Sequence, residues 1–148
     1  MREGAENMQM PDVNVLIYAH REESPGHARH AAWVTALATG LEPFALSELV
    51  LQGFIRVVTN PRIFNPPSTT EQAFEFVDSL TELPGCVTIR PGPNHWKIFR
   101  RLCEVGQVRG KIVADAAHAA LAIESGCEWV TADTDFARFA PLLRWRHV

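Results

Sequence analysis

The sequence predicts an α/β fold of three layers, an α/β/α arrangement in which helices cover both faces of a central, mainly parallel sheet. Its 148 residues are the length of one domain with one core. Hydrophobic residues make up 47% of the chain and charged residues 21%, as in ordinary globular proteins. Short β-rich runs alternate with helical stretches of about 10 to 15 residues, which is typical of βα units with parallel strands.

The N-terminal residues are mixed in charge and carry no clear periodicity. We therefore expect residues 1–9 to form a flexible extension before a single domain over residues 10–148. The apolar, β-branched run Asp12–Tyr18 predicts a strand. A helix is expected from about Pro25 to Ala38, because Ser24 suits the N-cap and Pro25 the first helical position.

The rest of the chain continues the alternation of strands and helices. Ser47 suits the N-cap of a second helix, and Gly126 suits the end of an Ala-rich one. The expected elements are an extended piece at Pro43–Leu46, a helix from Ser47 to Val58, a loop over 59–70, a helix from Thr70 to Glu82, a strand at Cys86–Arg90, a helix after Asn94, a helix at Ile112–Ser125, a strand at Glu128–Ala132, a turn at Phe136–Phe139 and a strand at Leu143–Val148.

Bulk features and missing motifs exclude several classes of protein. The formal net charge is −3, whereas nucleic-acid binders are usually strongly basic. The three cysteines are far apart, so we expect neither a disulfide framework nor a cysteine zinc site, and a reducing cytoplasm is the expected location. No apolar run approaches the roughly 20 residues of a membrane helix, and no signal peptide is visible. Dinucleotide, P-loop and G-x-S-x-G motifs are absent, and the pair His27 and His30 is expected on a solvated helix face.

Carboxylates stand where charge is unfavourable. Each lies at the boundary of an apolar run: they are Asp12, Glu48, Asp115, Asp133 and, two residues later, Asp135. Taken singly, each has an ordinary explanation as a helix or turn cap, or as a charge near the positive end of a helix. Taken together in a parallel α/β fold, they would repel one another without a cation between them.

A divalent cation is the simplest partner for these acids. The chain has only two lysines and no arginine close in sequence to the first four acids. Oxygen ligands without a cysteine or histidine set favour Mg²⁺ or Mn²⁺ over zinc. Such a site suits phosphodiester hydrolysis, because the metal activates water and stabilises the leaving oxygen.

Four short motifs, in order, resemble a known family. They are D-V-N from residue 12, S-E-L from residue 47, A-D-A-A-H-A-A-L-A from residue 114 and T-A-D-T-D-F from residue 131. In this order and spacing they are similar to the PIN-domain ribonucleases, and most similar to the VapC toxins of bacterial toxin–antitoxin (VapBC) systems. The resemblance covers about residues 10–147.

The resemblance implies an activity and a set of site residues. It implies a toxin that cuts RNA with metal-activated water and is silenced by a cognate VapB-type antitoxin, and it makes a homodimer plausible. The acidic quartet would be Asp12, Glu48, Asp115 and Asp133, with Asp135 as a further metal ligand; Asn14 and Thr131 would orient ligands or water.

The resemblance also disagrees with the local pattern at the N-terminus. It places Asp12 at the C-terminal end of a strand and makes VLIYAH a short helix. Pro11 lacks a backbone donor, so that strand must be short or end its ladder there. We follow the resemblance for the topology, because β-branching alone is a weak signal.

RNA binding at net charge −3 requires a local basic surface. Residues 100–111 carry a local excess of three positive charges, and the candidate RNA-binding residues are Arg100, Arg101, Arg109 and Lys111. Two alternatives to the ribonuclease function stay open. An aspartyl-nucleophile phosphatase would need a D-x-D start, which the chain lacks. A catalytically inactive PIN-like module, acting only in binding or regulation, would not need all four acids.

Overall fold

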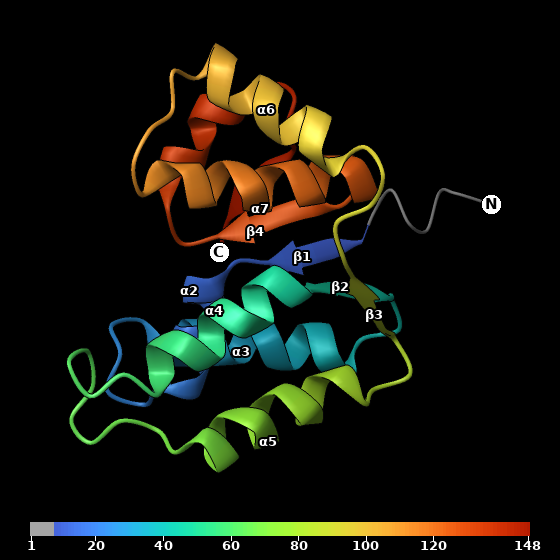
Figure 1. Ribbon diagram of the computed structural model, residues 1–148. Coiled ribbons are helices and arrows are strands. Elements are labelled where there is room, and N and C mark those ends of the chain that lie inside the picture. Colours follow the sequence, from blue (N-terminus) through green and yellow to red (C-terminus); the bar gives the residue numbers. More distant parts are fainter. Residues whose placement is uncertain (1–7) are drawn as a thin grey trace.

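Parallel strands form the centre of the computed structural model, which describes residues 8–148. Along the chain the elements are β1 (Gln9–Pro11), α2 (Val13–His20), α3 (His27–Thr39), β2 (Phe44–Ser47), α4 (Glu48–Val58), α5 (Thr70–Thr81), β3 (Cys86–Ile89), α6 (His95–Val105), α7 (Ile112–Ser125), β4 (Glu128–Thr131), the 3₁₀ helix η1 (Thr134–Phe139) and β5 (Trp145–His147) (Figure 1).

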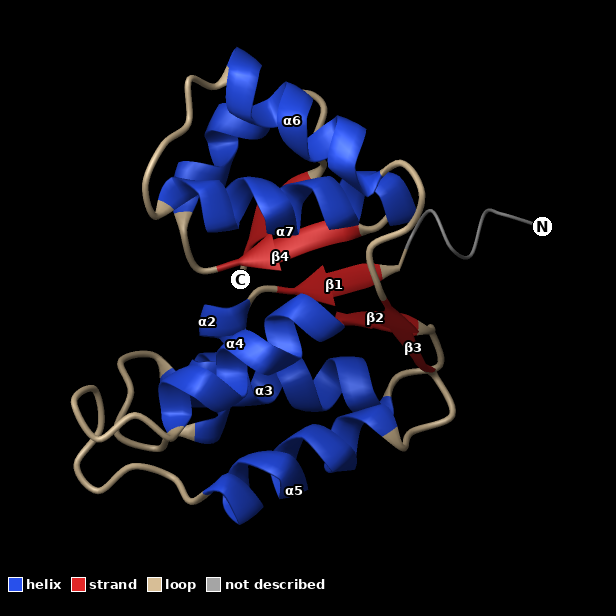
Figure 2. Cartoon of the chain, viewed as in Figure 1, coloured by secondary structure: helices blue, strands red, loops and turns tan. Residues whose placement is uncertain are grey.

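The strands form two parallel sheets that lie edge to edge. β4 pairs with both β1 and β5 in one sheet, and β2 pairs with β3 in the other. β1 lies beside β2, so Figure 2 shows β4, β1, β2 and β3 in order across the middle of the molecule. In this view α6 and α7 lie on one side of the strands and α2 to α5 on the other. The predicted three-layer α/β fold with parallel strands is confirmed, with a break in the ladder between β1 and β2.

The folded region begins before residue 10. Gln9 pairs with Glu128 as the first residue of β1, and Met8 is buried in the core. The flexible extension expected over residues 1–9 is therefore wrong at its last two residues, because pairing with β4 and burial hold them. Residues 1–7 lie outside the described part of the chain, and the single domain stays a prediction.

The strand predicted for Asp12–Tyr18 is wrong. Asp12 has extended backbone angles and caps α2: its Oδ1 accepts a 2.6 Å hydrogen bond from the Val13 N–H. An N-cap of this kind favours the start of a helix, whereas the β-propensity of the residues that follow depends strongly on context. The helix expected from the resemblance is confirmed, and β1 is short and ends at Pro11, as its missing donor requires.

The helix expected from Pro25 begins two residues later, at His27. Gly26 adopts a left-handed conformation (φ 72°), which a continuous helix does not tolerate, and becomes the N-cap of α3. This start turns His30 into the core, where it is 6% exposed and forms a 5.1 Å edge-to-face contact with Tyr18. The prediction that His27 and His30 lie on a solvated helix face is therefore wrong for His30.

Most other elements agree with the sequence to within a few residues. The Ser47 hydroxyl accepts hydrogen bonds from the N–H groups of Leu49 and Val50 and so caps α4. Thr69 and Gln72 form a capping box at the start of α5. α7 spans Ile112–Ser125 as expected, and Gly126 ends it in the left-handed conformation (φ 71°).

The core lies between the strands and the helices. Its largest fully buried side chain is Trp129 of β4, which packs on Phe136 at a ring distance of 5.3 Å. Small side chains on the buried face of α7, among them Ala116 and Ala120, allow this helix to approach the strands closely. The first turn of α7, which carries Asp115, is thereby held at the sheet.

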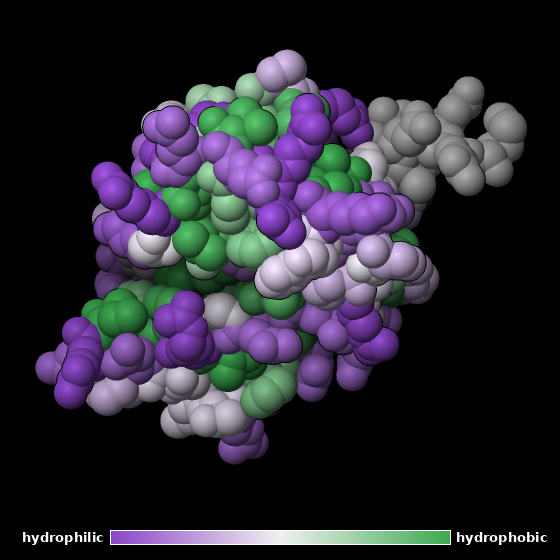
Figure 3. Space-filling model, turned by 45° about the horizontal axis from the view of Figure 1, so that its top comes forward, coloured by the Kyte–Doolittle hydropathy of each residue, from purple (hydrophilic) through white to green (hydrophobic). Residues whose placement is uncertain are grey.

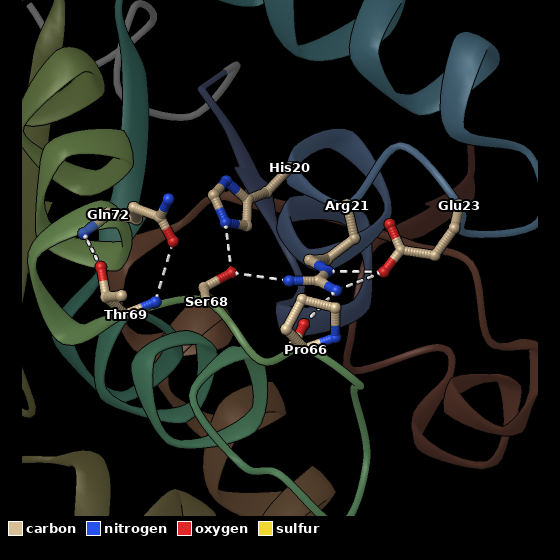
Figure 4. Close-up of polar contacts among 7 residues, drawn as sticks. All are labelled: His20, Arg21, Glu23, Pro66, Ser68, Thr69 and Gln72. Carbon is tan, nitrogen blue, oxygen red and sulfur yellow. Dashed lines mark hydrogen bonds and ion pairs between the residues drawn. The ribbon is translucent and has the colours of Figure 1, made fainter.

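The loop before α5 is fixed to the end of α2 (Figure 4). Arg21 donates to Ser68 Oγ at 3.1 Å and to the carbonyl oxygen of Pro66 at 2.8 Å. Ser68 Oγ also lies 2.9 Å from His20 Nε2, and the Arg21 guanidinium stacks over Phe64 at 4.5 Å. Since the donors and acceptors of this cluster pair with one another, it serves to hold the loop.

The face of the molecule drawn in Figure 3 is mostly polar. Hydrophilic side chains cover much of the face in Figure 3, and hydrophobic ones gather around a hollow across it. Among residues 8–148, no helix is both long and apolar enough to span a membrane.

Replacing the N-cap of α4 tests the local origin of this helix. We expect Ser47→Ala to lower the free energy of unfolding by about 1 kcal/mol, because two N–H groups of the first turn, one of them buried, lose their acceptor. Chemical denaturation measures this loss. Thr69→Ala removes an exposed cap from α5 and is the matched control, with a similar or smaller loss. A Ser47→Ala protein as stable as the wild type would contradict the assignment of the cap.

Candidate active site

The predicted acids gather at the C-terminal edge of the strands. Asp12 follows β1 and Glu48 follows β2, while Asp133 lies two residues after the end of β4. Asp115 comes from the first turn of α7. Parallel strands end at one edge of a sheet, and this edge is where α/β proteins usually bind their ligands.

Asp12 is the most buried acid of the group. It is 6% exposed, and both of its carboxylate oxygens accept hydrogen bonds. Oδ1 accepts from the Val13 N–H at 2.6 Å, and Oδ2 accepts from the Thr131 hydroxyl at 2.7 Å. These bonds fix the orientation of the carboxylate at the end of β1.

Thr131 and Asn14 organise the turn after β4. The Thr131 hydroxyl also accepts from the N–H of Asp133 at 2.9 Å, so one side chain links two of the acids. Asn14 Oδ1 accepts from the N–H of Ala132 at 3.3 Å. Asp133 then caps η1 by accepting from the N–H of Asp135 at 2.8 Å.

Repulsion and burial act together on these carboxylates. Burial, and after it the charges of Asp115 and Asp133, raise the pKa of Asp12 from 3.8 to about 7, against the lowering effect of its two hydrogen bonds. The pKa of Asp115 is also raised, first by burial and then by the charges of Asp133 and Asp135. The structure therefore brings these aspartates close enough for their charges to interact. They are Asp12, Asp115, Asp133 and Asp135.

Glu48 differs from the other acids in its partner. Its Oε2 lies 2.8 Å from Nε of Arg90, which follows β3. It is not among the charges that raise the pKa of Asp12. Glu48 therefore lies at the same edge of the sheet, but its carboxylate is engaged with an arginine.

The donor chemistry at this edge suits a hard divalent cation. All the side chains in question offer oxygen atoms, and their mutual repulsion is the condition that such a cation relieves. Across residues 8–148, no three or more Asp, Glu, His or Cys side chains converge closely enough to hold a metal ion as they stand. The residues fit the chemistry of a metal site, and several of their carboxylates, Glu48 among them, would have to move together to hold the ion.

Basic residues flank the acids. Lys111 and Arg138 lie near enough to lower the pKa of Asp115. Arg100, Arg101 and Arg109 are exposed, and Arg100 pairs with Glu104 on its own helix at 2.9 Å.

Sequence reasoning did not single out Arg138 or Arg90. Arg138 lies seven residues after the end of β4, and its Nε donates to the carbonyl oxygen of Asp135 at 3.2 Å. Their positions in the sequence were the available signal: Arg90 is the last residue of the strand predicted at Cys86–Arg90, and Arg138 lies just beyond the last acids.

A groove adjoins Glu48 between α4 and α5. It has a volume of about 520 Å³ and is lined mainly by apolar side chains, including Leu51, Ile55 and Val77. Phe74, on its wall, is 50% exposed. Glu48 thus lies between the acidic edge and an apolar groove.

Comparison with known proteins gives concordant results. The family model described as PIN domain matches residues 10–142. The chain is 46% identical over 136 residues to Ribonuclease VapC43 of Mycobacterium tuberculosis, with 92% of each chain covered. It is 39% identical over 141 residues to Ribonuclease VapC31 of the same species, covering 95% of this chain and 97% of the relative.

Solved structures share the fold. VapBC2 from Rickettsia felis, bound to a DNA fragment from its promoter, gives a TM-score of 0.69 at 19% identity and covers 95% of this chain and 98% of its own. VapBC-1 from nontypeable Haemophilus influenzae gives 0.66 at 18% identity, with 95% and 97% covered.

The raised pKa of Asp12 predicts how stability depends on pH in metal-free buffer. Between its unfolded value of 3.8 and about 7, the folded chain binds more protons at Asp12 than the unfolded chain, so this group's contribution to stability is lost as the pH rises. Asp12→Asn removes the effect. We expect the melting temperature of the variant, minus that of the wild type, to increase by several degrees between about pH 5 and about pH 8.

Taking the difference between Asp12→Asn and the wild type removes the effect of other titrating groups on the melting temperature. Burial lowers the pKa of His118 to about 4, which acts on stability in the opposite direction below its ordinary value of 6.5. Both proteins contain His118, so its effect drops out of the difference. A difference in melting temperature that is constant with pH would show that Asp12 titrates normally.

Proposed function

The chain belongs to the PIN-domain family, and we propose that it is a metal-dependent endoribonuclease of the VapC type, the toxin of a toxin–antitoxin pair. Relatives at 46% and 39% identity carry the name ribonuclease. The observation on which the proposal mainly depends is the buried Asp12 carboxylate, which faces the charges of Asp115 and Asp133 at the ligand-binding edge of a parallel sheet. The reaction is hydrolysis of an RNA phosphodiester bond.

Oxygen ligands would hold the metal, which we propose to be Mg²⁺ or Mn²⁺. The proposed ligands are Asp12, Glu48, Asp115 and Asp133, with Asp135 as a further one. A bound divalent cation supplies a water of lowered pKa and stabilises negative charge on the leaving oxygen. Thr131 keeps one oxygen of Asp12 oriented, and Asn14 holds the turn that carries Asp133.

Basic side chains would receive the RNA backbone. Of the predicted RNA-binding residues, Lys111 lies near Asp115. Arg138, which was not predicted, also lies near Asp115. We propose Arg100, Arg101 and Arg109 as contacts with more distant phosphates, since they are exposed on the same region of the chain.

A VapB-type antitoxin is the proposed partner. The apolar groove beside Glu48 suits a hydrophobic segment of such a protein, whose binding there would also cover the acids. A homodimer and a cytoplasmic location, where RNA is accessible, belong to the same proposal.

Removing one acid tests the catalytic assignment. We expect Asp115→Asn to reduce cleavage of total cellular RNA in Mg²⁺ or Mn²⁺ by at least about a hundredfold, because a metal ligand is lost. Its melting temperature should equal or exceed that of the wild type, since one of several like charges is gone. Gel analysis of the RNA and thermal unfolding provide the two measurements.

The matched control is Asp78→Asn, which removes an exposed aspartate from α5 and should leave cleavage unchanged. Chelation with EDTA should stop cleavage by both active proteins. Full activity of Asp115→Asn would refute the metal role. No metal-dependent cleavage by the wild type would favour the alternative, an inactive PIN-like module.

Expression in a bacterial host tests the toxin part of the proposal. We expect the wild-type chain, produced without a partner, to slow or stop growth because it degrades host RNA, and we expect Asp115→Asn to have little effect. Growth curves are compared at matched protein levels measured by immunoblot. Equal growth of the two cultures would argue strongly against a toxin.

A further inference from the structure

Arg90 is placed at the candidate site by the register of the strands. Ser47 pairs with Ile89 in the β2–β3 ladder, so the residues that follow them, Glu48 and Arg90, leave the sheet side by side. Nε of Arg90 lies 2.8 Å from Oε2 of Glu48. The contact thus follows directly from the parallel pairing.

This ion pair contributes little to the stability of the fold. The Arg90 side chain is 73% exposed and that of Glu48 36%. Exposed ion pairs have small effects on stability, because water screens both charges. The contact engages a carboxylate of the proposed metal site with an arginine, and Glu48 is not among the charges that raise the pKa of Asp12.

An arginine in this position suits a phosphodiester. Its guanidinium is a planar fork of N–H donors that matches two phosphate oxygens, and the contact with Glu48 uses its Nε. Lys111 and Arg138 supply positive charge on the side of Asp115. Arg90 supplies it on the other flank, beyond β2, so that an RNA strand crossing the acids meets a cation on each side.

We propose that Arg90 is a phosphate-binding residue of this site and exchanges Glu48 for an RNA phosphate when substrate binds. The proposal rests on the proposed ribonuclease function. In the free protein Glu48 is held by Arg90. When a phosphate takes its place on the guanidinium, Glu48 is released toward Asp12 and Asp133. RNA binding and completion of the acidic set are thereby coupled.

RNA binding without cleavage tests the phosphate contact. The probe is a short, fluorescent, single-stranded RNA of mixed sequence in EDTA, titrated at salt concentrations between about 50 and 200 mM. Loss of one phosphate contact should reduce the slope of log K against log salt by about 0.7. We expect Arg90→Gln to show this reduction and to bind several-fold more weakly at low salt.

Arg146→Gln is the matched control. Arg146, the middle residue of β5, forms a comparable ion pair, with its Nε 3.3 Å from Oε1 of Glu128. Because Glu128 is the first residue of β4, this contact draws the guanidinium toward the end of the strand that lies away from the acids. Arg146→Gln also removes one positive charge, but it should keep the wild-type slope of log K against log salt. Arg90→Lys keeps a charge without the fork, and should restore the slope but not the full affinity.

Metal binding tests the exchange with Glu48. In the absence of RNA, Arg90→Gln frees Glu48, so we expect Mn²⁺ to bind about two- to fivefold more tightly, the range that an exposed ion pair can account for. The same substitution in a Glu48→Gln background should have no such effect. Free Mn²⁺ measured by electron paramagnetic resonance gives all four affinities of this double-mutant cycle.

The results separate this proposal from the ribonuclease function. Weaker RNA binding together with tighter Mn²⁺ binding supports the exchange. An unchanged salt slope in Arg90→Gln, or equal tightening with and without Glu48, overturns it even if the wild type cleaves RNA. Absence of cleavage by the wild type concerns the proposed function instead.

Discussion

The burial of the Asp12 carboxylate is the constraint on which the rest of the site depends. A charged group almost enclosed by the core is costly unless its oxygens are hydrogen-bonded and its charge is compensated. Val13 and Thr131 satisfy the oxygens, whereas Asp115 and Asp133 add charge of the same sign. The arrangement is therefore unfavourable for folding alone and favourable for binding cations, which is the property that a metal-dependent nuclease requires.

The fold partly offsets this repulsion through its helices. Asp12 caps α2, Glu48 is the first residue of α4, and Asp115 lies in the first turn of α7. The start of a helix carries about half a positive charge from its free N–H groups. Three acids from distant parts of the sequence can therefore share one edge of the strands at a lower cost, because each stands at the positive end of a helix.

Local sequence signals predicted much of the fold and identified the acids of the candidate site. They did not predict the ion pair of Glu48 with Arg90. α7 was located to the residue because alanines favour the helix and Gly126 ends it. The strand expected from Asp12 onward was wrong because one capping side chain outweighed β-branching, and the resemblance corrected it. The acids were found from their positions at apolar boundaries. The contact of Glu48 with Arg90 was missed because it joins residues 42 positions apart through strand register, which no short motif encodes.

The break between β1 and β2 has a consequence for the proposed metal site. Within each sheet, backbone hydrogen bonds set the separation of neighbouring strands at about 4.8 Å. Asp12 and Asp133 belong to one sheet and Glu48 to the other, so no such bonds fix the distance between them. That distance is set by the volume of side chains such as Met10 and Leu46, both fully buried. The spacing of the acids thus depends on core packing, so substitutions of buried apolar side chains can alter which cation the proposed site accepts.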